Sequence, residues 1–320
     1  MKQFLFCACT ALLLLSCSNE PACEPDNNDD AIKISALIAN VKPADRTTIS
    51  GTGTASWANS DSIGLFCTQS KPAASNVKFT ASGLPTTPVW TPASNIYWAD
   101  GNTTHTFLAY YPYASGNTAA AVKLPALVPQ TGTINPVQDF LLSRNYGTTG
   151  ITRPGDNSVG LVFTHGFALI NFQITINSSI ASGTTLTSLA LTGTGGASDK
   201  IFTTDGNSTI ALSTGAITTT GGTTTNTITV TPSPSPILSA TVTNIYIIIL
   251  PGTYASTLQI TLSEGGTSIS VPVANIASNA FAAASKYTYT VAISRTAITV
   301  SNPTITDWVS VPSGSISGGI

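Results

Sequence analysis

Short apolar runs separated by turn-forming residues fill the chain from residue 32 onward. The runs are rich in Val, Ile, Thr, Phe and Tyr, and clusters of Gly, Pro, Asn and Ser bound them. Because β-branched and aromatic side chains suit a pleated, half-buried surface, this pattern predicts β-strands. The clearest runs are residues 32–38, 62–66, 107–111, 159–163, 167–176, 245–250, 258–262 and 287–293. Residues 275–284 are a candidate for a short helix.

The density of these runs predicts an all-β fold made of antiparallel β-sandwiches. A polar loop at residues 147–157 contains Pro154 and Gly155, and three of the four tryptophans precede it. After the loop, Thr, Ser and Gly dominate the composition. We therefore predict two domains, an N-terminal one over residues 32–158 and a C-terminal one over residues 159–320.

The first residues of the chain predict export from the cytoplasm. Met1 and Lys2 give a short positive start, residues 4–15 are almost wholly apolar, and small Ser16 precedes Cys17. The apolar core is too short to span a bilayer, so residues 1–16 are predicted to be a secretory signal. The segment resembles the lipobox of bacterial lipoproteins, in which the cysteine sulfur accepts a diacylglycerol and acyl chains such as palmitate. The alternative is an ordinary cleaved signal with an incidental cysteine.

Residues 17–31 are expected to be a flexible tether, because they are acidic, rich in Pro and Asn, and poor in apolar side chains. Their acidic cluster resembles the export signals that carry some Bacteroidales lipoproteins to the outer face of the outer membrane. We therefore expect a protein anchored to the outer membrane at the cell surface through lipid on Cys17. Whether a disulfide joins Cys23 in this tether to Cys67 in a predicted strand is left open.

Charge and the scarcity of reactive residues exclude several functions. Only 8% of the residues are charged and the net charge is −2, so no basic patch for nucleic acid is expected. The chain lacks His-x-x-x-His, Cys-x-x-Cys and Gly-x-Ser-x-Gly patterns, and its acids form no recognisable pair. We therefore predict no enzyme activity, no metal and no cofactor, and we interpret His105 and His165 as structural.

An ordered series of aromatic and turn residues is more specific. Large aromatic side chains at strand ends bury much area, and a proline ends a strand, so these residues are expected to determine the fold. The residues, called the marker residues below, are Trp57, Asp61, Gly64, Phe66, Tyr97, Trp98, Tyr110, Tyr111, Pro112, Tyr113, His165, Tyr287 and Trp308. In this order they resemble the fimbrillin-like proteins of Bacteroidales, which are subunits and accessory tips of type V pili. The resemblance runs from about Arg46 to Trp308.

The resemblance implies two transthyretin-like sandwich domains and a particular assembly reaction. An arginine-specific protease removes the lipidated N-terminal segment together with the first strand, and a strand from a neighbouring pilin subunit then takes its place. The candidate cleavage position is Arg46, which follows the first apparent strand and is the only arginine before Arg144. The alternative is a solvent-facing arginine at a turn.

Two functions remain open at this stage. The first is a structural or adhesive pilus subunit assembled by strand exchange, and the Gly- and Ser-rich residues after Trp308 favour an accessory or tip position over a stalk position. The second is a monomeric surface lipoprotein that binds a glycan or a host protein through its loops.

Overall fold

The computed structural model of the protein describes residues 30–39, 57–84, 88–195, 202–203, 208–219 and 224–308. Apart from 3-10 turns such as η2 (Pro136–Gln138), these residues form strands and loops, with no α-helix. The predicted all-β class is therefore confirmed. No helix in the described ranges is long and apolar enough to cross a membrane.

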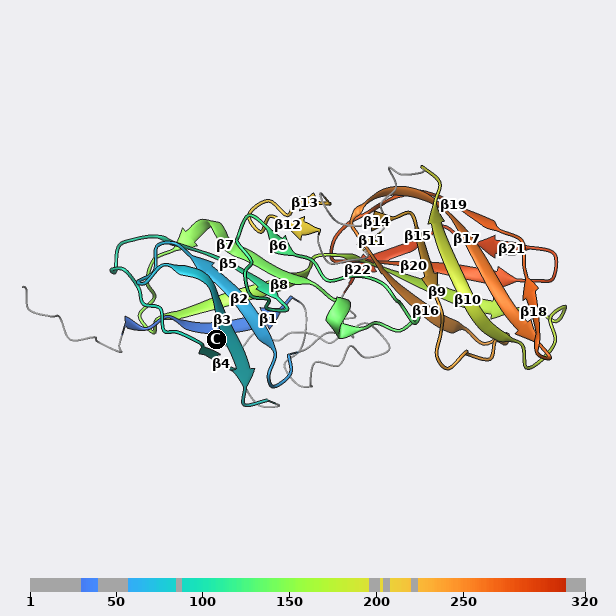
Figure 1. Cartoon of the computed structure of the whole chain (residues 1–320), viewed down its shortest axis with the longest axis horizontal. Coiled ribbons are helices and arrows are strands. Elements are labelled where there is room, and N and C mark those ends of the chain that lie inside the picture. Colours follow the sequence, from blue (N-terminus) through green and yellow to red (C-terminus); the bar gives the residue numbers. More distant parts are fainter. Residues whose placement is uncertain are drawn as a thin grey trace, which may run out of the picture.

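Seven strands form one sheet, which we call the first lobe together with its core. They are β1 (Lys33–Ile38), β2 (Ser62–Cys67), β3 (Ala74–Ser82), β4 (Val89–Pro92), β5 (His105–Tyr111), β7 (Leu141–Ile151) and β8 (Ser158–His165). Their order is β1-β8-β7-β5-β2-β3-β4, on the left of Figure 1. Every neighbouring pair in this sheet is antiparallel except β1 and β8, which run parallel.

The two outer edges of this sheet are tied together at the start of β1. The N–H of Ile32 donates to the carbonyl oxygen of Ile96 at 2.9 Å, and the N–H of Trp98 donates to that of Asp30 at 3.1 Å. Because residues 96–98 follow β4, the strand at the far edge, the sheet curls around its own apolar core.

Two further sheets form the second lobe, on the right of Figure 1. One contains β10 (Thr185–Gly193), β15 (Thr227–Val230), β17 (Gly252–Glu264), β18 (Thr267–Ser270) and β19 (Ala274–Phe281), with β17 paired to both β18 and β19. The other contains β9 (Ala168–Ile176), β16 (Thr243–Ile249), β20 (Ser285–Ile293), β21 (Ile298–Val300) and β22 (Thr304–Asp307). Buried side chains from both sheets belong to one hydrophobic cluster, so the sheets share a core.

Segments far apart in sequence join the two lobes. β6 (Val122–Lys123) pairs with β12 (Thr209–Ile210), which pairs in turn with β13 (Ile217–Thr218); Figure 1 places this small sheet between the lobes. The side-chain amide of Gln130 exchanges two hydrogen bonds with the backbone of Ile248, at 2.8 and 2.9 Å. A short two-stranded ribbon, β11 (Phe202–Thr203) with β14 (Thr224–Thr225), completes the fold.

Residues 275–284 do not form a helix, because most of them belong to strand β19, which pairs with β17 and buries Ile276 and Phe281. The division into domains at residues 158 and 159 stays a prediction. The hydrogen-bonded ladder runs on past it, since β8 belongs to the first-lobe sheet.

Candidate functional site at the first strand

The first strand of the fold is an edge strand that also completes the core of the first lobe. Its outward residues are exposed, whereas Ile34, Ala36 and Ile38 are 8%, 1% and 4% exposed, and Ile32 just before the strand is 4% exposed. The alternation follows from the two-residue period of a strand. Burying one isoleucine stabilises a fold by roughly 1.5–3 kcal/mol, so β1 contributes substantially to the stability of this lobe.

The partner of β1 along its whole length is β8. The register runs from Lys33 opposite Ser158 to Ile38 opposite Phe163. The N–H of Lys33 donates to Asn157 at 3.0 Å, and the N–H of Ala39 donates to Phe163 at 2.7 Å. We call the edge of β8, together with the core positions filled by the inward residues of β1, the β1 site. It is built to hold an extended strand.

The marker residue Trp57 contacts β1 directly. Its indole Nε1–H donates to the carbonyl oxygen of Ala36 at 2.9 Å. The ring packs edge-on against three others, with centroid distances of 5.1 Å to Trp90, 5.4 Å to Tyr111 and 5.2 Å to Phe163. Edge-to-face contacts of this kind add to the energy of area burial, so Trp57 is firmly held.

Asp61 fixes the segment that carries Trp57. One carboxylate oxygen accepts the N–H of Ala58 at 2.7 Å, and the other accepts the hydroxyl of Tyr111 at 3.1 Å. Burial raises the pKa of Tyr111 well above its usual value, and the negative charge of Asp61 raises it further. Tyr111 therefore stays protonated as the donor, and three marker residues meet beside β1.

The ring of Tyr110 packs directly over Gly64. A Cβ atom at Gly64 would overlap the ring of Tyr110, so only glycine fits beneath that ring. The hydroxyl of Tyr110 lies 2.9 Å from Oδ1 of Asn76 and accepts from Nδ2 of Asn117 at 2.9 Å. Phe66 stacks on the same ring at 6.2 Å. These markers hold the first sheet to the loops between the lobes.

Tyr97 and Trp98 lie in the connection between β4 and β5, and Pro112 and Tyr113 directly follow β5. Tyr97 pairs through its backbone with Lys71, and Trp98 packs on His105 at 4.7 Å. Pro112 follows β5, and the N–H of Tyr113 donates to Ser62 at 2.8 Å. These contacts position the ends of neighbouring strands.

His165, Asp139 and Trp308 form a buried group at the junction of the lobes. Nδ1 of His165 lies 2.7 Å from Oδ1 of Asp139, and its ring stacks on Trp308 at 4.0 Å. Tyr287 belongs to the second core, where its hydroxyl donates to Ala280 at 2.7 Å. The sequence contained no signal that Asp139 and His165 would pair, since 26 residues separate them.

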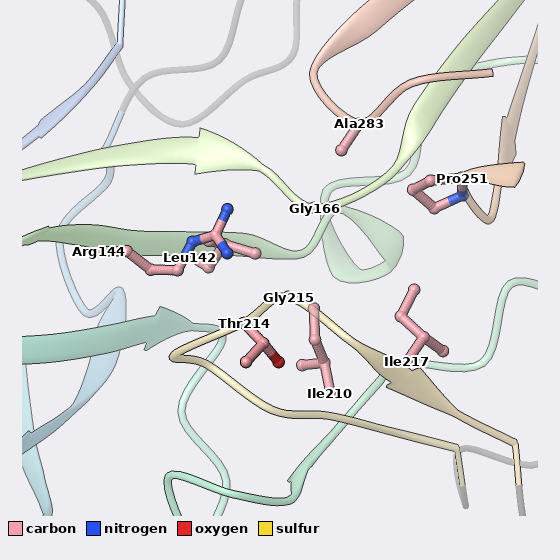
Figure 2. Close-up of a pocket in the computed structure, with 9 residues that line it drawn as sticks. All are labelled: Leu142, Arg144, Gly166, Ile210, Thr214, Gly215, Ile217, Pro251 and Ala283. Atoms are coloured by element: carbon pink, nitrogen blue, oxygen red, sulfur yellow. The ribbon is translucent and has the colours of Figure 1, made fainter. Parts of the chain in front are cut away.

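An open cavity of about 380 Å³ lies between the lobes. Its lining is mostly aliphatic, with the guanidinium of Arg144 projecting into the gap (Figure 2). The lining residues are Leu142, Arg144, Gly166, Ile210, Thr214, Gly215, Ile217, Pro251 and Ala283. In the part of the chain that the structure describes, Arg144 has no ion-pair partner. Sequence reasoning missed this cavity, because its residues come from five separate segments.

The remaining predicted sites fall in two groups. Cys17, Cys23 and Arg46 lie outside the described residues. Cys67 is a buried free thiol whose pKa is raised by burial. Within the described ranges, no group of three or more His, Cys, Asp or Glu residues is placed to hold a metal ion.

Comparisons with known proteins agree with one another. The model of the fimbrillin-like family matches residues 46–308. A candidate fimbrium subunit of Bacteroides uniformis, Fim1C, is 28% identical over 319 residues and is matched over 96% of this chain and 95% of its own length.

Two crystal structures show the same fold. A candidate cell adhesion protein of Bacteroides uniformis has a TM-score of 0.56 at 20% identity, with 88% of this chain and 99% of that chain covered. A fimbrial protein of Bacteroides vulgatus has a TM-score of 0.54 at 14% identity, covering 88% and 100% of the two chains.

Proposed function

Because the chain belongs to the fimbrillin-like family, we propose that it is a surface fimbrium subunit that joins its neighbours by β-strand exchange. Family members are fimbrial subunits and cell adhesion proteins and not enzymes, and such proteins work at the cell surface. The proposal adds how this chain is delivered, processed and joined to a partner.

The observation that carries the proposal is the placement of β1. The strand lies at a sheet edge, contributes three inward side chains to the core in addition to that of Ile32 just before it, and is followed by the candidate cleavage site Arg46. Cleavage there leaves β1 attached only by noncovalent contacts. Its departure uncovers the edge of β8 and the core positions beneath it. An incoming strand then gains main-chain hydrogen bonds for affinity and fills side-chain positions for specificity.

Delivery of the chain to the cell surface depends on Cys17, at the other end of the segment that cleavage at Arg46 removes. Lipid on Cys17, linked through residues 18–29, holds the uncut chain at the outer membrane, because several acyl chains anchor far longer than one. Cutting at Arg46 releases the lipid and β1 in the same event. The anchor is thus a property of the precursor.

The residues after Trp308 favour an accessory or tip position. When Asp307 is aligned with Asp30, Val309, Val311 and Ser313 fall at the positions of Ile32, Ile34 and Ala36. However, Pro312 falls at the position of Ser35. The N–H groups of Lys33 and Ala39 donate toward β8, and the alternation of the strand points the N–H of Ser35 the same way. Proline has no N–H to make this bond. Ser315 falls at the position of Ile38. This tail is a poor strand for the β1 site of another copy.

The experiment is mass spectrometry and unboiled gel electrophoresis of the protein from the cell surface, before and after arginine-specific proteolysis. We expect a new N-terminus at Thr47 and a ladder of detergent-resistant complexes, both absent in an Arg46→Ala variant. An N-terminus that stays at acylated Cys17, without a ladder, would rule out assembly by this route.

The cavity between the lobes favours the second candidate function, a surface lipoprotein that binds a glycan or host protein. Arg144 is a cation without an ion-pair partner in the described ranges, and Thr214 adds a hydroxyl, so an acidic ligand would fit best. A glycan array probed with the intact chain and with Arg144→Gln tests it. Binding of acidic glycans by the unchanged chain alone would support this function, and binding by neither would remove it.

A further inference from the structure

The β1 site closes tightly over one of its inward positions. Three of the four inward residues of this segment are isoleucines, and the third position holds Ala36. Ala36 is only 1% exposed, although its side chain is a single methyl group. Neighbouring groups therefore close over this position and leave little space for a longer side chain.

Trp57 contacts the strand at this point. Its indole nitrogen is 2.9 Å from the carbonyl oxygen of Ala36, and both residues belong to the buried core of the first lobe. Trp90, Tyr111 and Phe163 pack around the indole with centroids 5.1 to 5.4 Å away. Trp57 is itself 6% exposed. It cannot move aside without disturbing this aromatic group, because a close-packed core accommodates added volume poorly.

We propose that Trp57 makes the β1 site selective for a partner strand with a small residue at its third inward position. The inference rests on the proposed strand exchange and names the chemistry of the partner. The preferred strand runs parallel to β8 and carries aliphatic residues at the first, second and fourth inward positions. Alanine, serine or glycine occupies the third position, and its carbonyl oxygen accepts the indole N–H.

The same feature sets the register of the incoming strand. A shift by two residues keeps the apolar face inward but places Ile34 or Ile38 against Trp57. Alternation alone would tolerate that shift, since the side-chain period of a strand is two. The small position therefore excludes registers that the hydrophobic pattern would allow.

The test uses the full chain with residues 43–48 replaced by the recognition site of a sequence-specific protease that cuts nowhere else. After cleavage, labelled peptides of residues 30–39 compete with the noncovalently held β1, and fluorescence polarisation reports their binding. One peptide is unchanged, one carries Ala36→Leu, and one carries Ser35→Leu. The last adds the same bulk on the outward face and is the matched control.

We expect the unchanged and Ser35→Leu peptides to bind alike and the Ala36→Leu peptide to bind at least tenfold more weakly. Equal binding of the two leucine peptides would overturn the selectivity and leave strand exchange intact. If no peptide binds, strand exchange itself fails and this inference fails with it.

A second comparison assigns the selectivity to Trp57. In a Trp57→Phe variant of the same cleavable chain, we expect the two leucine peptides to differ by less than threefold. An unchanged tenfold difference would show that another residue closes the position and would overturn the role of Trp57. If this variant does not fold, the peptide comparison on the unchanged chain still decides whether the third inward position is selective for a small residue.

Discussion

The indole of Trp57 connects the backbone of an edge strand to the aromatic core beneath it. Its N–H is bonded to Ala36, whereas the indole nitrogen of nearby Trp90 is buried with no hydrogen-bond partner in the described ranges. Both rings are 6% exposed and pack on one another at 5.1 Å. The two tryptophans thus have similar surroundings and differ in one polar contact, which makes them a natural pair for mutation.

We expect Trp57→Phe to lower the free energy of unfolding more than Trp90→Phe does. Both changes leave a cavity, but only the first removes a hydrogen bond from a buried carbonyl, which costs about 1–3 kcal/mol. Urea denaturation of the uncut chain, followed by far-UV circular dichroism, measures the difference. Equal losses for the two variants would mean that the bond to Ala36 contributes nothing to stability.

Individual structural residues could be picked out from the sequence, but their contacts with one another could not be predicted. Trp57, Asp61 and Tyr111 were identified as determinants of the fold, yet nothing in the sequence placed the indole on Ala36 or the phenol on Asp61. The pairing of Asp139 with His165 was equally invisible. Such contacts depend on how strands are ordered in the sheet, and short-range patterns carry little information on that order.

The first strand shows that one element can be both peripheral and central. It pairs along its length with a single strand, β8, yet its inward side chains belong to the first-lobe core. Hydrogen bonding alone would make it an easily removed edge, whereas burial of its isoleucines holds it in place. The balance between these two contributions would set how readily β1 leaves if the chain is cleaved at Arg46.

Matched substitutions on the two faces of β1 test this balance. We expect Ile38→Ala to destabilise the uncut chain by about 2–4 kcal/mol, because Ile38 is 4% exposed and its loss leaves a cavity. Leu37→Ala should change stability by less than about 0.5 kcal/mol, since Leu37 is 56% exposed. Thermal unfolding measures both. A reversed order would show that β1 presents its other face to the core.

Most strands were predictable because a short run of β-branched and aromatic residues between turn residues is sufficient to identify a strand. The run at residues 167–176 corresponds to β9, and the run at residues 287–293 falls within β20. The helix expected at residues 275–284 was wrong because their small side chains alternate weakly, and pairing with β17 decided their conformation. The parallel pairing of β1 with β8 was not predictable, since nothing local distinguishes it from pairing with any other strand.

At the scale of the whole molecule, the two lobes are joined by crossed segments and not by a simple linker. β6 comes from the first half of the chain and pairs with β12 from the second half, while Gln130 bonds to Ile248. Stacked rings of Tyr110 and Phe140, followed by Phe167, continue the contact across the junction. Force along a fibre would therefore load both lobes together.

Assembly of the purified chain tests its position in a fibre. Cut at an inserted protease site in place of residues 43–48, the chain alone should stay monomeric, because Pro312 and Ser315 make its tail a poor strand for the β1 site. Replacing residues 309–315 with the sequence of residues 32–38 should produce a ladder. Size-exclusion chromatography distinguishes the outcomes, and polymers of the unmodified chain would instead indicate a stalk subunit.

The parallel pairing of β1 with β8 also determines when the first lobe is completed during folding. Lys33 lies opposite Ser158, so the chain must close a loop of more than a hundred residues before the two strands can pair. The entropic cost of closing a loop rises slowly with its length, and contacts between residues far apart in sequence form more slowly than local ones. The remaining strands of the lobe pair through much shorter loops. A lobe that receives its first strand last meets the same kinetic problem as a lobe that awaits a strand from another chain.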